Sequence, residues 1–139
     1  MIILGTDVLS QLQRNNPRVI ERIETSNDSL FITLITKLEM LRGRIDYILK
    51  ASSVQDILYA QELFVQTEVF LSRLPVLSIS DASLSTFVKL QGMPGHRKVG
   101  RADLLIASIT IANRATLVTR NTKDFNKITG LKVENWMDS

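Results

Sequence analysis

Short runs of apolar residues alternate along this chain with longer stretches in which apolar positions recur every three or four residues. The runs at 1–6, 30–34, 75–79 and 115–119 are predicted to be strands, because short, mostly apolar runs are typical of strands buried on both faces. Residues 131–134 are a candidate fifth strand. The stretches between them are predicted to be helices. Strands that alternate with helices favour an α/β fold with a mainly parallel sheet covered on both faces.

The helical stretches carry recognisable starting residues. Asp7 is predicted to cap the first helix, and Pro17 suits the first turn of the second. Apolar positions from Leu38 to Leu49 lie on one helix face, and a long amphipathic helix is predicted to follow. Asp81 is the predicted cap of the next helix.

The last predicted helix is the most apolar one and follows a basic loop. Residues 92–100 contain three glycines, and the helix at 102–113 is so apolar that most of it is expected to be buried. We find no internal repeat and no glycine- or serine-rich linker. The chain is therefore predicted to be a single domain over 1–139.

Composition narrows the possible functions. The 139 residues include no cysteine, which excludes disulfides, thiolate zinc sites and cysteine nucleophiles. The apolar start, residues 1–4, is too short for a signal peptide, and no later run reaches membrane-spanning length. We expect a cytoplasmic protein without a membrane partner.

The charge balance hints at a polyanionic partner. Seventeen basic residues exceed 14 acidic ones, which gives a net charge of +3. If four of the acids belong to a metal site, the remaining surface carries an excess of seven positive charges. A basic surface around a small acidic pocket is what a metal-dependent nuclease requires.

Four acidic residues stand where the carboxyl edge of the predicted sheet should be. Asp7 follows the first strand, Glu39 lies early in the helix after the second, Asp103 opens the apolar helix, and Asp124 follows the fourth strand. Ligands in open α/β sheets bind at this edge. Crowded carboxylates are stable when a cation neutralises them, and Mg²⁺ or Mn²⁺ prefers such oxygen ligands.

Each acid also has an ordinary structural interpretation. Asp7 is equally compatible with a helix cap and Glu39 with an exposed helix position. Asp124 fits a turn, and an acid such as Asp103 in a first turn also complements the helix dipole. Only their convergence on one edge would make them a site.

Four sequence motifs resemble those of PIN-domain toxins of the VapC type, in the expected order and over essentially the whole chain. The opening IILGTDVLS at 2–10 is similar to the family's apolar run followed by Asp-Thr-Asn or Asp-Thr-Asp. TKLEMLRG at 36–43 resembles the second motif and GRADLLIA at 100–107 the third. TRNTKDF at 119–125, with the residues up to Trp136, resembles the C-terminal end.

The resemblance implies a PIN-like three-layer α/β/α sandwich and hydrolysis of RNA with Mg²⁺ or Mn²⁺. It also implies a homodimer and a cognate VapB-type antitoxin that inserts a segment into the active-site groove. Carried over by position, the catalytic and metal-binding acids are Glu39, Asp103 and Asp124, with Asp7 beside them.

Supporting and RNA-binding residues are assigned around these acids. Thr6, Thr119 and Asn121 are placed to orient the carboxylates from behind. A basic set near Asp103 is a candidate for holding the RNA backbone, although a solvated surface loop is an equal alternative for it: Arg97, Lys98, Arg101 and Arg120. His96, the only histidine, has no visible partner and is interpreted as an ordinary loop residue.

The chain departs from the family pattern at one position. The first aspartate of the motif would fall at position 5, where this sequence has Gly5, so one ligand is missing and activity is expected to be impaired. Asp7 faces the same way if the backbone stays extended and would then substitute in part. An inactivating change, selected or engineered, and a natural pseudoenzyme are both compatible with this glycine.

Two rival functions remain open. One is a catalytically silent PIN-like protein that only binds an antitoxin peptide or RNA. The other is a phosphoacceptor signalling domain, for which Asp81 after the third strand is the only candidate acceptor.

Overall fold

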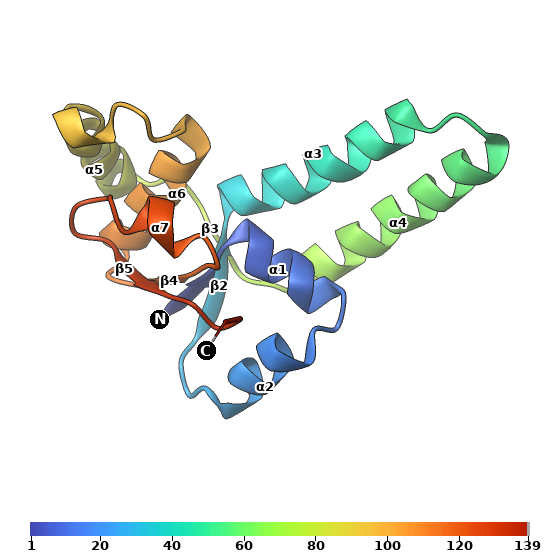
Figure 1. The fold of residues 1–139 in the computed structure, drawn as a ribbon, viewed down its shortest axis with the longest axis horizontal. Coiled ribbons are helices and arrows are strands. Elements are labelled where there is room, and N and C mark those ends of the chain that lie inside the picture. The colour runs from blue at the N-terminus through green and yellow to red at the C-terminus, as the bar shows by residue number, and fades with distance from the viewer. Residues whose placement is uncertain (139) are drawn as a thin grey trace.

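The structure, a computed structural model, describes residues 1–138 as a five-stranded sheet with helices on both faces (Figure 1). The strands are β1 (Ile2–Leu4), β2 (Leu30–Thr33), β3 (Val76–Leu77), β4 (Thr116–Val118) and β5 (Lys132–Glu134). The helices are α1 (Thr6–Gln13), α2 (Pro17–Thr25), α3 (Leu34–Lys50), α4 (Val54–Ser72), α5 (Asp81–Gln91), α6 (Arg101–Ala112) and α7 (Thr122–Phe125), with a 3₁₀ turn at Pro94–His96.

The sheet is entirely parallel, with the strand order β3-β2-β1-β4-β5. Neighbouring residues of β1 face opposite sides: Ile2 and Leu4 pack into one core cluster, and Ile3 packs into another. Since both faces are buried, the strands read in the sequence as continuous apolar runs. The predicted α/β/α sandwich with a mainly parallel sheet is confirmed.

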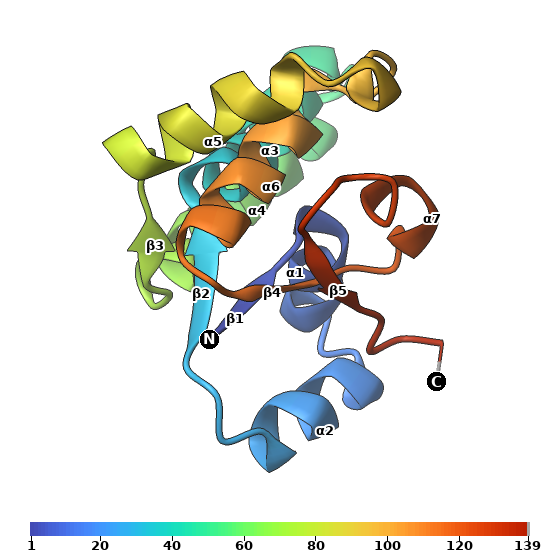
Figure 2. The same cartoon turned by 90° about the vertical axis from the view of Figure 1, so that its left-hand side faces the viewer.

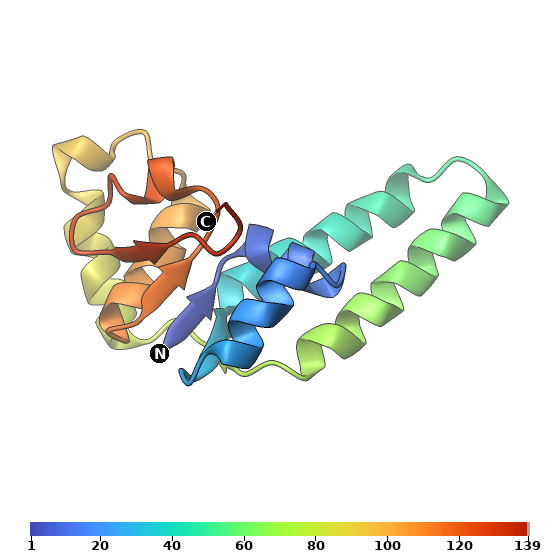
Figure 3. The same cartoon turned by 60° about the horizontal axis from the view of Figure 1, so that its bottom comes forward.

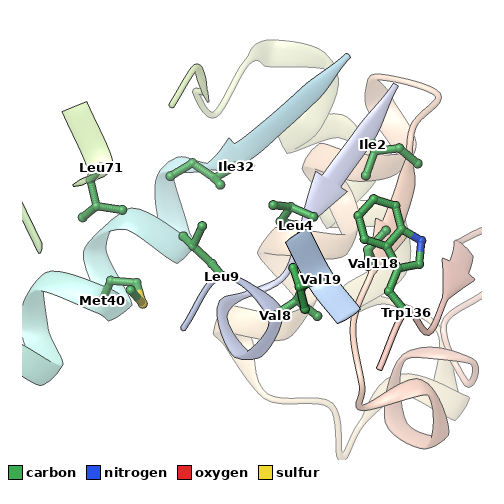
Figure 4. Close-up of a cluster of buried hydrophobic side chains, with 10 residues drawn as sticks. All are labelled: Ile2, Leu4, Val8, Leu9, Val19, Ile32, Met40, Leu71, Val118 and Trp136. Carbon is green, nitrogen blue, oxygen red and sulfur yellow. The ribbon is translucent and has the colours of Figure 1, made fainter. Parts of the chain in front are cut away.

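Two helical layers cover the sheet. Figure 2 shows α5 and α6 on one face and α1 and α2 on the other. The first cluster lies under α1 and α2, and Figure 4 shows how Leu9, Val19 and Trp136 meet around Leu4 of β1. Trp136 is thereby a buried packing anchor near the C-terminus.

The strand ends differ from the sequence prediction by at most two residues. The first strand was predicted to reach Thr6, but it ends at Leu4, and α1 begins at Thr6. The second ends at Thr33, whose hydroxyl accepts the Thr36 amide hydrogen bond and so caps α3. Helices α1 and α3 begin directly after these strands, because their N-cap residues, Gly5 and Thr33, are the last residues with extended backbone.

Two predicted caps were wrong by one or two positions. Gly5 is the N-cap of α1, without a side-chain cap, and Asp7 lies inside the first turn. Ser80, not Asp81, caps α5 by accepting from the Ser83 amide. In both cases the acid lies in the first turn, where it still complements the helix dipole.

Helices α3 and α4 form a hairpin that extends beyond the sheet (Figures 1 and 3). The apolar face predicted from Leu38 to Leu49 is therefore not a core face along its length, since Leu49 is 77% exposed. At the start of α4, Val54 is 74% exposed. Beyond the body of the molecule, each helix has only the other to cover it.

No helix among residues 1–138 is both long and apolar enough to span a membrane.

Candidate active site

A small acidic pocket lies at the carboxyl edge of the sheet. Asp7, Glu39 and Asp103 line this pocket of about 160 Å³, and they come from α1, α3 and α6. In the strand order, β1 lies between β2 and β4. From β1 the chain adds β2 and β3 on one side and then crosses back to add β4 and β5 on the other. Such a switch point leaves a crevice beyond the strand ends, where open α/β sheets bind ligands.

Asp7 joins the start of α1 to the end of β4. Its Oδ1 accepts a hydrogen bond of 2.8 Å from the Val8 amide, and its Oδ2 accepts one of 2.9 Å from the Arg120 amide. The buried Thr119 hydroxyl donates to both carboxylate oxygens, at 3.2 and 3.1 Å. The carboxylate is thus fixed by contacts more than 110 residues away in the chain.

Asp7 also occupies the space above Gly5. The backbone does not stay extended over residues 5–7, which was the condition for Asp7 to face the same way as position 5, because α1 begins at Thr6. A Cβ atom on Gly5 would nevertheless lie 3.2 Å from the Asp7 Oδ1 and 3.1 Å from the Val118 carbonyl oxygen. The Asp7 carboxylate therefore stands close to where a side chain at position 5 would start.

Glu39 is positioned by a pair of threonines. The Thr6 hydroxyl donates a 2.8 Å hydrogen bond to the Glu39 Oε1, and its oxygen lies 3.1 Å from the Thr36 Oγ1. Thr36 is fully buried, so this contact fixes the supporting hydroxyl and leaves the Glu39 carboxylate exposed. Sequence reasoning missed Thr36, although its spacing from the capping Thr33 is a recognisable signal.

Asp103 lies where the negative charges crowd. The pKa of its carboxyl is raised above the ordinary value, first by burial and then by the charges of Glu39, Asp124 and Asp7. All four acids singled out in the sequence therefore act on one place. That place favours a proton or a cation.

Asp124 lies in α7 on the far side of Asp103. The Asn121 side-chain amide donates a 3.1 Å hydrogen bond to the Asp124 Oδ2, and the Lys127 amino group lies 3.9 Å from Oδ1. Asp124 does not line the acidic pocket. It lines a neighbouring pocket of about 370 Å³ together with Asp103.

The donor set suits a hard divalent cation in kind and in place, but it is not gathered. All four candidates offer carboxylate oxygens, the ligands that Mg²⁺ and Mn²⁺ prefer. Among residues 1–138, however, no three acidic or histidine side chains lie close enough to share an ion. Glu39 and Asp124 are exposed, and Gly5 contributes no oxygen.

The predicted basic residues separate into two groups. Arg97 and Lys98 line the larger pocket beside Asp103. The Arg101 guanidinium instead lies 5.7 Å from the centre of the Phe87 ring, and the Arg120 side chain pairs with Asp138 at 3.2 Å. Arg120 reaches the acidic cluster only through its backbone amide.

His96 is not the ordinary loop residue that the sequence analysis expected. It is 5% exposed, and its Nδ1 lies 2.8 Å from the Leu90 carbonyl oxygen. Its Nε2 accepts a 3.3 Å hydrogen bond from the Thr129 amide. No local sequence pattern indicates this role, because both partners are backbone groups. One is near the end of α5 and the other lies in the loop after α7.

Comparison with known proteins gives a consistent picture. The sequence profile of the PIN domain matches residues 2–131. Ribonuclease VapC1 of Haemophilus influenzae is 28% identical over 137 residues, which are 96% of each chain. The tRNA(fMet)-specific endonuclease VapC of Shigella flexneri is 26% identical over 138 residues, again 96% of each.

The fold has close neighbours among solved structures. The complex VapBC2 from Rickettsia felis, bound to a DNA fragment from its promoter, contains a chain that superimposes with a TM-score of 0.78. That chain is 30% identical, and the match covers 98% of this chain and 99% of the neighbour.

Proposed function

The chain belongs to the PIN-domain family of VapC-type ribonucleases, and from that premise we propose that it is the toxin of a toxin–antitoxin pair that hydrolyses RNA with a divalent metal. We further propose that Gly5 weakens this activity. The observation that carries the proposal is the pocket at the carboxyl edge of the sheet that Asp7, Glu39 and Asp103 line together. The raised pKa of the Asp103 carboxyl, whose causes include the charges of Asp7, Glu39 and Asp124, supports it. Four segments of the chain thereby contribute negative charge to one place.

The chain's own residues would position the reaction. Glu39, Asp103 and Asp124 would hold Mg²⁺ or Mn²⁺, with Asp7 beside them, and the ion would supply Lewis acidity at the scissile phosphate. Thr6 orients Glu39, and Asn121 orients Asp124. Thr119 and the Arg120 amide hold the Asp7 carboxylate in place beside the space above Gly5.

RNA and protein partners follow from the same proposal. Arg97 and Lys98 provide positive charge beside the acids for an RNA backbone. A VapB-type antitoxin is the proposed protein partner, by analogy with the Rickettsia felis complex. A second copy of the chain is proposed as a further partner. The exposed apolar side chains of the hairpin, Leu49 and Val54, supply surface for such contacts.

The test is a ribonuclease assay with Mg²⁺ or Mn²⁺ on three proteins: the chain itself, Gly5→Asp, and Gly5→Asp combined with Asp7→Asn. A new carboxylate at position 5 crowds Asp7, so the double variant recreates the family's Asp-Thr-Asn with less repulsion. We expect the double variant to cut RNA fastest and the unmodified chain slowest.

The control for this assay is Asp103→Asn in the double-variant background, purified in the same way to reveal contaminating nucleases. It should abolish cleavage. If neither restored protein cuts RNA with either metal, the ribonuclease proposal is wrong for this chain.

Gly5 specifically favours a second candidate, a silent PIN-like protein that binds RNA or an antitoxin peptide. This candidate requires that the unmodified chain binds RNA or the peptide and leaves RNA intact with either metal. Measurable cleavage by the unmodified chain, lost in Asp103→Asn, would exclude it.

A further inference from the structure

The larger pocket beside the acids has room for more than an ion. Its volume of about 370 Å³ falls within the range of about 300–1,000 Å³ usual for small-molecule sites. It shares the lining residues Asp103 and Phe125 with the acidic pocket, so the two pockets adjoin. We propose that this pocket holds one unstacked nucleotide of the RNA strand, next to the phosphodiester that is cut; the inference rests on the proposed ribonuclease function.

The inner wall of this nucleotide pocket is apolar. Val99, Phe125 and Ile128 line it, and the last two are almost fully buried in the core beneath α5 and α6. Sequence-specific recognition of RNA depends on single-stranded bases that are splayed out and held against such surfaces. The wall therefore offers a base the apolar contact that it loses when it leaves the stack.

The rim of the nucleotide pocket is positively charged. Arg97 and Lys98 are exposed on it and form no ion pair with any residue from 1 to 138, while the Lys127 amino group stands 3.9 Å from Asp124. Contacts of cationic side chains with phosphates fix the register of a nucleic acid on a protein. An apolar interior with a cationic rim matches a base that carries its phosphate at the mouth.

His96 joins the two walls of the pocket. The loop that carries Arg97 and Lys98 is tied through the His96 ring to the Leu90 carbonyl on one side and to the Thr129 amide on the other. Thr129 directly follows the wall residue Ile128. The pocket is thus shaped before RNA arrives, which lowers the entropic cost of binding.

Nuclear magnetic resonance on the ¹⁵N-labelled full chain tests whether a base is bound. The probes are AMP, UMP and inorganic phosphate, each at millimolar concentration in EDTA. We expect a nucleotide to shift the amide signals of Gly95, Gly100 and Lys127 more strongly than phosphate does. Equal shifts with phosphate alone, or nucleotide shifts confined to other regions, would overturn the proposal.

A charge variant tests the rim. With a short fluorescent single-stranded RNA in EDTA, Lys98→Gln should weaken binding and lower the slope of log K against log salt by about 0.7, the value for one phosphate contact on a single strand. Lys50→Gln is the matched control, because Lys50 ends α3 at the outer end of the hairpin. Equal behaviour of the two variants contradicts a phosphate contact at this rim.

Parallel cleavage assays separate this proposal from the ribonuclease proposal. If the restored protein, Gly5→Asp with Asp7→Asn, cuts RNA while neither probe nor variant points to the nucleotide pocket, only the pocket inference fails. If the restored protein neither binds nor cuts RNA, both fail.

Discussion

At the scale of single residues, the acids of the site differ in how many hydrogen-bond donors hold them. Asp7 accepts three donors and lies against Gly5, whereas Asp103 accepts no hydrogen bond from the side chains and loop backbone of residues 1–138. The acid without a hydrogen bond from these groups is the one with the raised pKa. A cation would act first on that residue.

Replacing Asp103 with asparagine should stabilise the metal-free protein at neutral pH. Because the pKa of Asp103 is raised by folding, the folded state binds more protons than the unfolded state between the ordinary and the raised value. Stability from this group therefore falls as pH rises through that window. Water screens the half-exposed carboxyl, so the gain should not exceed about 1 kcal/mol.

Urea unfolding in EDTA measures this effect, at neutral pH and again near the ordinary aspartate pKa of about 4. The advantage of Asp103→Asn should shrink at the lower pH. Asp81→Asn is the control, since Asp81 is an exposed acid in the first turn of another helix. An equal gain in unfolding free energy for both variants would mean that the crowding of acids around Asp103 does not cause the gain.

At the scale of elements, the sequence predicts which segments form strands and helices better than it predicts where each element ends. Strand β5 is exposed at Lys132 and Glu134. Strands β1, β2 and β4 and the buried helix α6 could be predicted because burial on both faces leaves runs with few polar residues. The ends could not, since the cap residues Gly5 and Ser80 are chosen by backbone geometry rather than by the nearest acid.

The candidate site divides in the same way. Motif order and strand ends predicted that Asp7, Glu39 and Asp103 would meet. Thr119, which bonds Asp7, was predicted to support the carboxylates. The Arg120 amide on Asp7 and the Thr129 amide on His96 could not be predicted, because only the tertiary fold brings them close. The apolar pattern of α4 also predicted a helix, but it did not indicate which of its apolar side chains are buried in the core and which are exposed on the hairpin.

Two identical substitutions in α4 test that distinction. Leu71 is 1% exposed and Leu58 is 61% exposed. Leu71→Ala should cost about 2–5 kcal/mol of unfolding free energy because it leaves a cavity in the core. Leu58→Ala should stay within about 0.5 kcal/mol, as for other surface changes.

Chemical denaturation of the two variants is the measurement. A cost for Leu58→Ala as large as that for Leu71→Ala would show that the outer hairpin is covered in solution, either by a second copy or by closure onto the body. Light scattering on the same samples would then distinguish the two cases.

At the scale of the whole molecule, the parallel order of the sheet decides where chemistry is possible. The three acids that line the acidic pocket lie on helices that begin at one edge, and the basic loop at 97–98 borders the same edge. The hairpin extends away from the sheet, as Figure 3 shows. The fold thus separates a reactive edge from an apolar extension suited to protein partners.

Calorimetric titration with Mn²⁺ tests most directly whether these acids act together on a cation. The chain should bind the ion weakly, the Gly5→Asp/Asp7→Asn protein more tightly, and the Asp103→Asn protein not at all. If Asp103→Asn binds Mn²⁺ as well as the unmodified chain, or if the restored protein binds none, the acids at this edge do not form a metal site.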